Sequence, residues 1–270
     1  MLIDLHIHTT FSDGKLTPEE VVEKAAKLNL KAIAITDHDT IDGINFAIER
    51  AKYYPSLEIV PGIEINTDFE NEEVHILGYY IDYKNHFLQF KLRELQEMRN
   101  NRIKNMIEKL DKLNIPIKNE DVEKEADGPS LGRPHLARII VKKGYASSIE
   151  EAFHLYLDKG KPAYVPRYKL TPIEAIELIK KSRGIPVLAH PGLIKNKDIV
   201  FKIFKMGIKG IEVYHKEHTK EDSNYFIELA KKYNLLMTGG SDCHGDPLLM
   251  GSQPVPYEFL IKLKDAKKDY

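Results

Sequence analysis

Two histidines on one short strand, followed by a turn that adds a carboxylate, constrain this chain more than any other stretch. The first fourteen residues, MLIDLHIHTTFSDG, alternate polar and apolar as far as His8, so a strand places His6 and His8 on one face. Two imidazoles at this spacing can bind one metal ion. The chain then turns and adds the carboxylate of Asp13. We therefore expect the fold to bring further ligands to these three side chains.

Length and composition indicate an ordinary globular protein of 270 residues, 42% of them hydrophobic and 30% charged. The net charge of −1 gives no overall positive field, and no basic groove with interleaved aromatic residues is visible, so we expect no long nucleic acid as a partner. The single cysteine, Cys243, is typical of a reducing compartment. With no leader segment and no apolar run of membrane-spanning length, we expect a cytoplasmic protein without a membrane partner.

Short apolar runs alternate with helical patterns in two parts of the chain. Thr17 and Thr171 each begin a T-P-x-E capping box, which marks a helix start. Further helices are expected near residues 43–54, 198–206 and 222–233. Apolar runs predict strands, mostly parallel, at residues 32–36, 58–64, 74–81, 186–189, 210–214 and 235–238. This alternation favours either a TIM-like barrel or an open doubly wound sheet.

The positions of polar residues favour the barrel. His38, Glu64 and His190 lie at or just past the ends of predicted strands, and Asp242 and His244 follow the last one. Barrel enzymes gather their chemistry where the carboxyl ends of the strands converge, whereas an open sheet binds at one crevice and rarely uses every strand. We therefore predict an α/β fold with a closed or nearly closed TIM-like barrel.

A helical insertion is expected between two halves of the barrel. From about residue 85 to 161 the chain has few strand-like runs and many charges and helix formers, with one long helix near 87–113 and shorter ones near 134–143 and 148–158. A break is expected at Asp127, Gly128 and Pro129. We predict a discontinuous barrel domain at 1–84 and 162–270 and a helical subdomain for substrate recognition at 85–161.

Six of the 11 histidines and three carboxylates fall at the mouth of the predicted barrel. Isolated polar residues on loops are usually solvated or capping groups, and we interpret Asp37, Asp39, Asp42, His86, His154 and His218 in this way. Imidazole and carboxylate ligands suit Zn, Mn or Fe, and nine candidates exceed the needs of one ion, so two or three divalent ions are expected. The nine candidates are His6, His8, Asp13, His38, Glu64, His75, His190, Asp242 and His244.

Five motifs in order along the chain resemble those of the PHP (polymerase and histidinol phosphatase) superfamily. They are HxHTxxSDG from His6, TDHD from Thr36, PGIE from Pro61, AHPG from Ala189 and SDCH from Ser241. The resemblance implies a distorted (β/α)7 barrel with two or three metal ions. It also implies the grouping of ligands: one ion at His6, His8, Glu64 and Asp242, a second at Glu64, His75 and His190, and a third at Asp13, His38 and His244.

No serine or cysteine nucleophile elbow is recognisable, so a multi-metal site predicts hydrolysis of a phosphate ester by a metal-activated water. Asp13 and His215 are the catalytic candidates. His215 lies past a strand end but matches no family ligand position, and we interpret it as a phosphate contact or general acid, with a structural hydrogen bond as the alternative.

We expect cationic side chains beside Gly and Pro turns, in and just after the insertion, to select the substrate. Arg133, His135, Lys161 and Arg167 are the candidates, because a guanidinium suits a second phosphate, whereas Arg138 is interpreted as a surface charge within a helix. Their segments, GRPH and GKPAYVP, are similar to those of the PHP subgroup that removes the 3′-phosphate from nucleoside 3′,5′-bisphosphates, some members of which also trim short RNA from the 5′ end.

The leading hypothesis is therefore a metal-dependent phosphoesterase that acts on a small nucleotide with two phosphates or on a short oligonucleotide. One alternative is a histidinol-phosphate phosphatase, which the basic insertion disfavours. Another is a non-catalytic PHP module that only binds metal or a partner, which the intact ligand set disfavours.

Overall fold

The computed structural model describes residues 2–125 and 131–268, and these fall into two compact units. Unit 1 consists of Met1–Phe90 and Lys169–Tyr270, and unit 2 consists of Lys91–Tyr168. The expected break at Asp127, Gly128 and Pro129 lies outside the described residues. The domain boundaries inferred from the sequence, at 84/85 and 161/162, stay a prediction.

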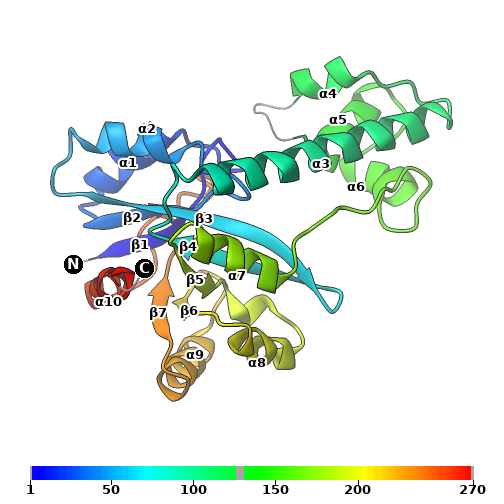
Figure 1. Cartoon of the computed structure of the whole chain (residues 1–270). Coiled ribbons are helices and arrows are strands. Elements are labelled where there is room, and N and C mark those ends of the chain that lie inside the picture. Colours follow the sequence, from blue (N-terminus) through cyan, green and yellow to red (C-terminus); the bar gives the residue numbers. More distant parts are fainter. Residues whose placement is uncertain (1, 126–130, 269–270) are drawn as a thin grey trace. The chain divides into compact units, whose positions relative to one another are not determined.

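Unit 1 is built on one sheet in which strands that are neighbours in sequence are also neighbours in space (Figure 1). Within the described residues seven strands form this sheet: β1 (Ile3–Ile7), β2 (Ala32–Ile35), β3 (Glu58–Phe69), β4 (Glu72–Tyr79), β5 (Ile185–Leu188), β6 (Gly210–Tyr214) and β7 (Leu236–Gly239). The chain just beyond β7 pairs with the end of β1. The N–H of His8 donates a hydrogen bond to the carbonyl of Cys243 at 3.0 Å. The sheet is therefore a nearly closed barrel.

One strand departs from the expected parallel arrangement. β4 is antiparallel to both β3 and β5, whereas the other neighbouring pairs are parallel. The cause is a two-residue turn at Glu70 and Asn71, both with positive φ (50° and 66°), which joins β3 and β4 as a hairpin. The hairpin also extends β3 to Phe69, five residues beyond the predicted end.

Helices cover the strands of unit 1: α1 (Pro18–Lys27), α2 (Ile44–Ala51), α7 (Pro172–Lys181), α8 (Lys197–Lys205), α9 (Lys220–Lys232) and α10 (Tyr257–Lys267). α7 packs on β3, β4 and β5, α9 on β6 and β7, and α10 on β5 and β7 (Figure 1). The predicted capping boxes at Thr17 and Thr171 are confirmed, with Glu20 and Glu174 as the reciprocal partners. α10, near the end of the chain, is not among the helices predicted above.

A buried apolar cluster joins both ends of the barrel chain. It includes Ile3 and Leu5 of β1, Val187 of β5, and Leu260 and Leu263 of α10. Burial of these side chains contributes about 25 cal/mol per Å² of apolar surface. The cluster therefore packs α10 against strands from both halves of the barrel.

Unit 2 is helical. Its elements are most of α3 (His86–Asp111), α4 (Asn119–Glu125), α5 (Arg133–Lys142), α6 (Ile149–Ala152) and a π-helical turn (Phe153–Leu157). The helix expected over 148–158 is thus two short elements. Unit 2 has its own core, in which Ile103, Met106 and Leu110 of α3 lie in one cluster with Leu136 and Ile140 of α5.

Candidate metal centre

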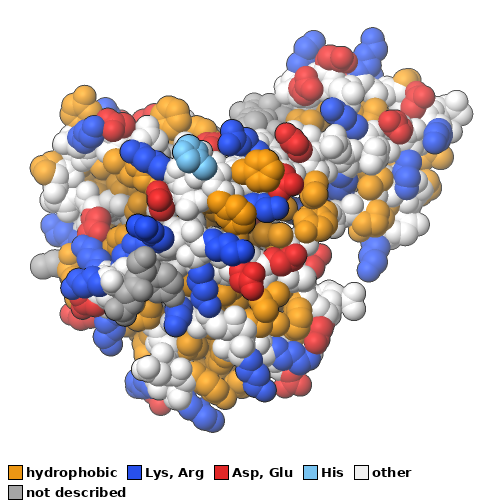
Figure 2. Space-filling model, viewed as in Figure 1, with side chains coloured by type: hydrophobic (Ala, Val, Ile, Leu, Met, Phe, Trp, Pro, Cys, Tyr) orange, Lys and Arg blue, Asp and Glu red, His pale blue; other side chains and the backbone are white. Residues whose placement is uncertain are grey.

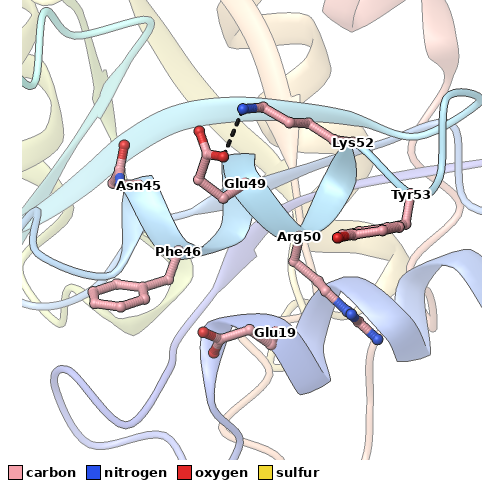
Figure 3. Close-up of a pocket in the computed structure, with 7 residues that line it drawn as sticks. All are labelled: Glu19, Asn45, Phe46, Glu49, Arg50, Lys52 and Tyr53. Carbon is pink, nitrogen blue, oxygen red and sulfur yellow. Dashed lines mark hydrogen bonds and ion pairs between the residues drawn. The ribbon is translucent and has the colours of Figure 1, made fainter.

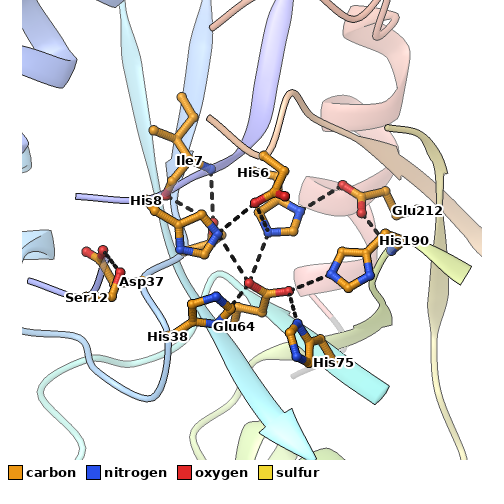
Figure 4. A network of polar contacts seen from close by, with 12 residues as sticks. His6, Ile7, His8, Ser12, Asp37, His38, Glu64, His75, His190 and Glu212 are labelled. Atoms are coloured by element: carbon orange, nitrogen blue, oxygen red, sulfur yellow. Dashed lines mark hydrogen bonds and ion pairs between the residues drawn. The ribbon is translucent and has the colours of Figure 1, made fainter. Parts of the chain in front are cut away.

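Glu64 lies at the middle of a cluster of imidazoles at the carboxyl ends of the barrel strands (Figure 4). Its Oε2 atom is 3.2 Å from Nε2 of His6, 3.2 Å from Nε2 of His8 and 3.1 Å from Nδ1 of His38. Its Oε1 atom is 2.9 Å from Nδ1 of His75 and 2.9 Å from Nε2 of His190. The two oxygens thus face two different sets of histidines, which is the geometry of a carboxylate that can bridge two ions.

Asp242 and Asp13 extend this cluster on the side of His8. Asp242 Oδ1 lies 3.1 Å from Nε2 of His8, and Asp13 Oδ1 lies 3.2 Å from Nε2 of His244. Asp13 Oδ2 lies 3.8 Å from Nε2 of His38. All nine predicted ligands are therefore brought together, by strands β1, β3 and β4 and by the loops that follow β1, β2, β5 and β7.

Three groups of these residues each offer ligand atoms within 4.8 Å of one another, a spacing suited to a metal ion. They are His6 with His8, Glu64 and Asp242; His8 with Asp13, His38 and His244; and His38 with Glu64 and His75. The first matches the grouping that the family resemblance implies. The family resemblance also places His190 beside Glu64 and His75. Nε2 of His190 lies 2.9 Å from Glu64 Oε1.

Buried ligand atoms without hydrogen bonds support a fit to metal. Among the described residues, Nε2 of His6, both ring nitrogens of His8, Nδ1 of His38 and Oε2 of Glu64 are buried and make no hydrogen bond of suitable geometry. A buried polar atom without a partner costs about 1–3 kcal/mol, so such atoms are rare unless another group satisfies them. Their convergence on one point fits a divalent ion.

The charges of the cluster are strongly coupled. Burial opposes the ionisation of Glu64, but His38, His6 and His75 hold the pKa of this carboxyl well below its usual range. Burial likewise opposes the charge of His8, but Asp242 and Glu64 raise the pKa of His8 to about 9. For His38, burial prevails and lowers its pKa to about 4.

Two carboxylates that sequence reasoning missed orient the ligand histidines. Glu212 is fully buried in β6, where its Oε1 accepts from Nδ1 of His6 at 3.1 Å and its Oε2 from the N–H of His190 at 2.8 Å. Glu73 Oε1 lies 3.2 Å from Nε2 of His75 and 2.7 Å from Nζ of Lys169. A carboxylate on the far nitrogen of a ligand imidazole fixes its tautomer and aims the other nitrogen at the metal. The only sequence signal for Glu212 is a lone acid in the apolar strand GIEVY.

Asp37 and Asp4 hold the loops around the centre. Asp37 accepts hydrogen bonds from the N–H and the hydroxyl of Thr9 (both 2.7 Å) and from the hydroxyl of Ser12 (2.6 Å). Asp4 accepts from the N–H and the hydroxyl of Ser241, which ties β1 to the loop after β7. A Cβ at Gly240 would collide with Cβ of His6, so this loop can approach β1 only with glycine there.

His215 is buried beside the cluster, and its tautomer argues against a ligand role. The N–H of Glu217 donates to Nδ1 of His215 at 3.2 Å, so the neutral ring carries its proton on Nε2, 3.4 Å from Asp242 Oδ2. A protonated nitrogen cannot bind a metal. His6, Glu212 and His215 also lie within 4.8 Å of one another; Glu212 hydrogen-bonds to His6, whereas Nε2 of His215 is buried without a hydrogen-bond partner.

The four predicted substrate residues belong to unit 2. Arg133 donates to the carbonyl of Leu157 at 3.3 Å and lies over the ring of Phe153. His135 accepts from the N–H of Gly132 at the start of α5, and Lys161 and Arg167 are partly exposed. Arg102 of α3, which sequence reasoning missed, donates to the carbonyl of Val165 at 2.7 Å.

A surface pocket elsewhere in unit 1 is a different feature. It lies between α1 and α2 and is lined by Glu19, Asn45, Phe46, Glu49, Arg50, Lys52 and Tyr53 (Figure 3). None of these seven residues is a ligand candidate. In the part of the chain that the structure describes, no helix is long and apolar enough to cross a membrane.

A nearly closed seven-stranded barrel with histidines and carboxylates gathered at its strand ends is the fold of a metal-dependent phosphoesterase. The crystal structure of a protein from Bifidobacterium adolescentis described as a metal-dependent phosphoesterase matches it with a TM-score of 0.79 and 31% sequence identity, over 97% of this chain and 94% of that one. Residues 4–157 match the PHP domain family, and the chain belongs to this family.

Two relatives of known activity match most of the chain. The 5′-3′ exoribonuclease Rnm of Escherichia coli is 36% identical over 263 residues, which cover 95% of this chain and 87% of that protein. The 3′,5′-nucleoside bisphosphate phosphatase of Chromobacterium violaceum is 32% identical over 250 residues, or 90% of this chain and 87% of that protein. The predicted family, fold class and enzyme class are confirmed, since the named relatives are hydrolases of phosphate esters.

Proposed function

We propose that this protein hydrolyses a phosphomonoester of a nucleoside 3′,5′-bisphosphate, with short oligoribonucleotides cleaved from the 5′ end as a second substrate class. The observation that carries the proposal is Glu64, whose two oxygens face two sets of imidazoles. The named activities of the two relatives, one on a nucleoside bisphosphate and one on RNA, support these substrate classes.

The nine clustered residues would hold two or three Mn, Fe or Zn ions, with Glu64 as the bridging ligand. Bound there, the ions supply an activated water and neutralise the oxygens of the phosphoryl group. Asp13 would be a ligand at the exposed side of the centre, where the substrate enters. Its pKa is lowered, since contacts with His244, His38 and His8 outweigh its burial, so it stays ionised at neutral pH.

His215 is suited to donate a proton. Its Nε2–H faces the cluster, and its Nδ1 is occupied by the N–H of Glu217, so the donor direction is fixed. We propose that His215 protonates the leaving oxygen or contacts the phosphate.

A group of arginines in unit 2 supports a second phosphate-binding site there. Burial lowers the pKa of Arg102 to about 10, and the neighbouring charges of Arg133, Arg167 and Arg99 contribute in the same direction. Like charges held close together are stabilised by an anion that binds between them, and guanidinium groups bind phosphate in a bidentate manner. We propose that Arg133, His135, Lys161 and Arg167, together with Arg102, select a substrate with two phosphates.

Phosphate release from adenosine 3′,5′-bisphosphate by Mn-loaded protein, beside an Asp13→Ala variant, tests the proposal. Activity that disappears in the variant supports a bisphosphate substrate hydrolysed at this cluster. Activity on histidinol phosphate in place of the bisphosphate would favour that alternative substrate. A folded protein that binds Mn but acts on neither compound would favour a module that only binds.

Cysteine chemistry supports a proposal for the compartment. Cys243 is buried and carries a free thiol. A free thiol in a chain with one cysteine suits a reducing compartment, so we propose that the protein works in the cytoplasm.

A further inference from the structure

Lys216 contacts a candidate metal ligand in two places. It lies two residues past the end of β6, and its side chain is 25% exposed. Its Nζ atom is 2.8 Å from the backbone carbonyl oxygen of Asp242 and 2.9 Å from Asp242 Oδ2. The lysine therefore holds both the backbone and the side chain of one aspartate.

Asp242 has a backbone that needs such support. Its φ angle is +48°, in the left-handed region that residues other than glycine rarely adopt. Its carbonyl oxygen also accepts a hydrogen bond from Nδ1 of His244 at 3.1 Å, which leaves Nε2 of His244 directed at Asp13. The carbonyl oxygen of Asp242 thus links Lys216 to His244, which belongs to the ligand group of His8, Asp13, His38 and His244.

The two carboxylate oxygens of Asp242 have separate partners. Oδ1 faces the ligand imidazoles, at 3.1 Å from Nε2 of His8 and 3.6 Å from Nε2 of His6. Oδ2 faces Nζ of Lys216 and Nε2 of His215. The ion pair of the Lys216 ammonium with Oδ2 opposes a rotation of the carboxylate that would offer both oxygens to one ion.

We propose that Lys216 is a positioning residue, which holds Asp242 for coordination through Oδ1 alone and keeps its carbonyl in place for His244. This inference rests on the proposed metal centre and does not depend on the identity of the substrate. Removal of the ammonium would leave Oδ2 without its ion pair and the Asp242 carbonyl without its hydrogen bond to Lys216. We expect this to increase the mobility of Asp242 and of His244, which belong to two different ligand groups. Loss of a residue that orients a metal ligand weakens metal binding about 10- to 100-fold.

The test is titration of metal-free protein with Mn²⁺ alone, in wild type, Lys216→Met, Lys216→Arg and the control Lys202→Met. Lys202 pairs with Glu70 on the surface and contacts none of the nine ligand candidates, so its variant should bind like wild type. We expect Lys216→Met to bind Mn²⁺ at least about tenfold more weakly, and Lys216→Arg to recover most of the loss because its side chain keeps the charge and the donors. Circular dichroism of the metal-free variants checks that each is folded.

A second readout reports on geometry. The visible spectrum of the Co²⁺-loaded protein should change in Lys216→Met and stay near that of wild type in Lys216→Arg, because a second carboxylate oxygen alters the coordination number. Equal Mn²⁺ binding in all four proteins would overturn the role of Lys216. Tighter binding in Lys216→Met would also overturn it, since the lysine would then act only by charge repulsion. A wild-type protein that binds no Mn²⁺ would instead refute the metal centre itself.

Discussion

Glu73 holds His75 by its outer nitrogen, with Oε1 of the carboxylate 3.2 Å from Nε2 of the imidazole. The Glu73→Gln variant keeps the size of the side chain but removes its charge. We expect Mn²⁺ binding at the group that contains His75 to weaken about 10- to 100-fold, measured by calorimetric titration. Glu70→Gln, which alters an exposed pair with Lys202, is the control. Unchanged affinity in Glu73→Gln would show that Glu73 does not orient His75.

Metal binding should release protons. Burial opposes the charge of His75, but Glu64 and Glu73 raise its pKa to about 9, as the pKa of His8 is raised to about 9. Both rings are therefore protonated at pH 7 without metal and must become neutral to bind it, whereas His38, with its pKa near 4, is already neutral. Mn²⁺ affinity should thus rise from pH 6 to at least about pH 9.

Calorimetry in buffers of different ionisation enthalpy measures this release directly. Burial opposes the charge of His6 as well, but Glu212, Glu64 and Asp242 raise its pKa well above its usual value. We therefore expect about three protons per fully loaded protein at pH 7, from His6, His8 and His75. An affinity that does not change with pH, with no buffer dependence of the heat, would show that these three rings are already neutral in the metal-free protein.

The His215→Ala variant should lose turnover and keep its metal. Because Nδ1 accepts from Glu217, the ring acts through its Nε2–H, and removal of a general acid costs about 10²- to 10⁴-fold in rate. Metal content by elemental analysis separates the possibilities. Unchanged turnover would remove His215 from the mechanism, and loss of metal together with turnover would make it a ligand.

Arg133→Gln should raise KM for a bisphosphate more than for a nucleotide with one phosphate. The expected change is about tenfold for the bisphosphate, because one charge-assisted phosphate contact is lost. Arg138 lies on the same helix α5, but it is exposed and pairs with Glu125, so Arg138→Gln is the matched control and should leave KM unchanged. Equal KM values in the two variants would refute a substrate role for Arg133.

The capping box of α1 gives a test of the fold. The hydroxyl of Thr17 accepts from the N–H of Glu20 at 3.2 Å, and the Glu20 carboxylate accepts from the N–H of Thr17 at 2.9 Å. Thr17→Ala should lower the free energy of unfolding by about 1 kcal/mol, measured by urea denaturation. Thr17→Ser, which keeps the hydroxyl, should restore most of it.

The sequence was informative where a signal is local. The capping boxes at Thr17 and Thr171 depend on residues three apart, and the strand ends were visible as apolar runs that stop at a histidine or a carboxylate. Most of the nine ligand candidates could be proposed from such ends because a barrel brings the carboxyl ends of its parallel strands to one face, whereas His75 lies near the start of the antiparallel strand β4.

The sequence was uninformative where a signal depends on tertiary contacts. Glu70 and Asn71 are not a strong turn pair, so the hairpin that reverses β4 was not expected. Glu212 and Lys216 resemble ordinary charged residues until the fold buries one against His6 and places the other on Asp242. The surface shown in Figure 2 explains why: acidic and basic side chains are interspersed on it, so one more charge in the sequence carries no positional information.

The pairing of the chain beyond β7 with β1 has a consequence for synthesis on the ribosome. His6 and His8 lie at β1, yet their partners Asp242 and His244 come more than two hundred residues later in the chain. A nascent chain that stops before Asp242 lacks a ligand of each of the two groups that contain His8. The two groups that contain His8 are therefore complete only in a chain that extends to Asp242 and His244, and we expect shorter fragments to lack the hydrolytic chemistry proposed for this protein.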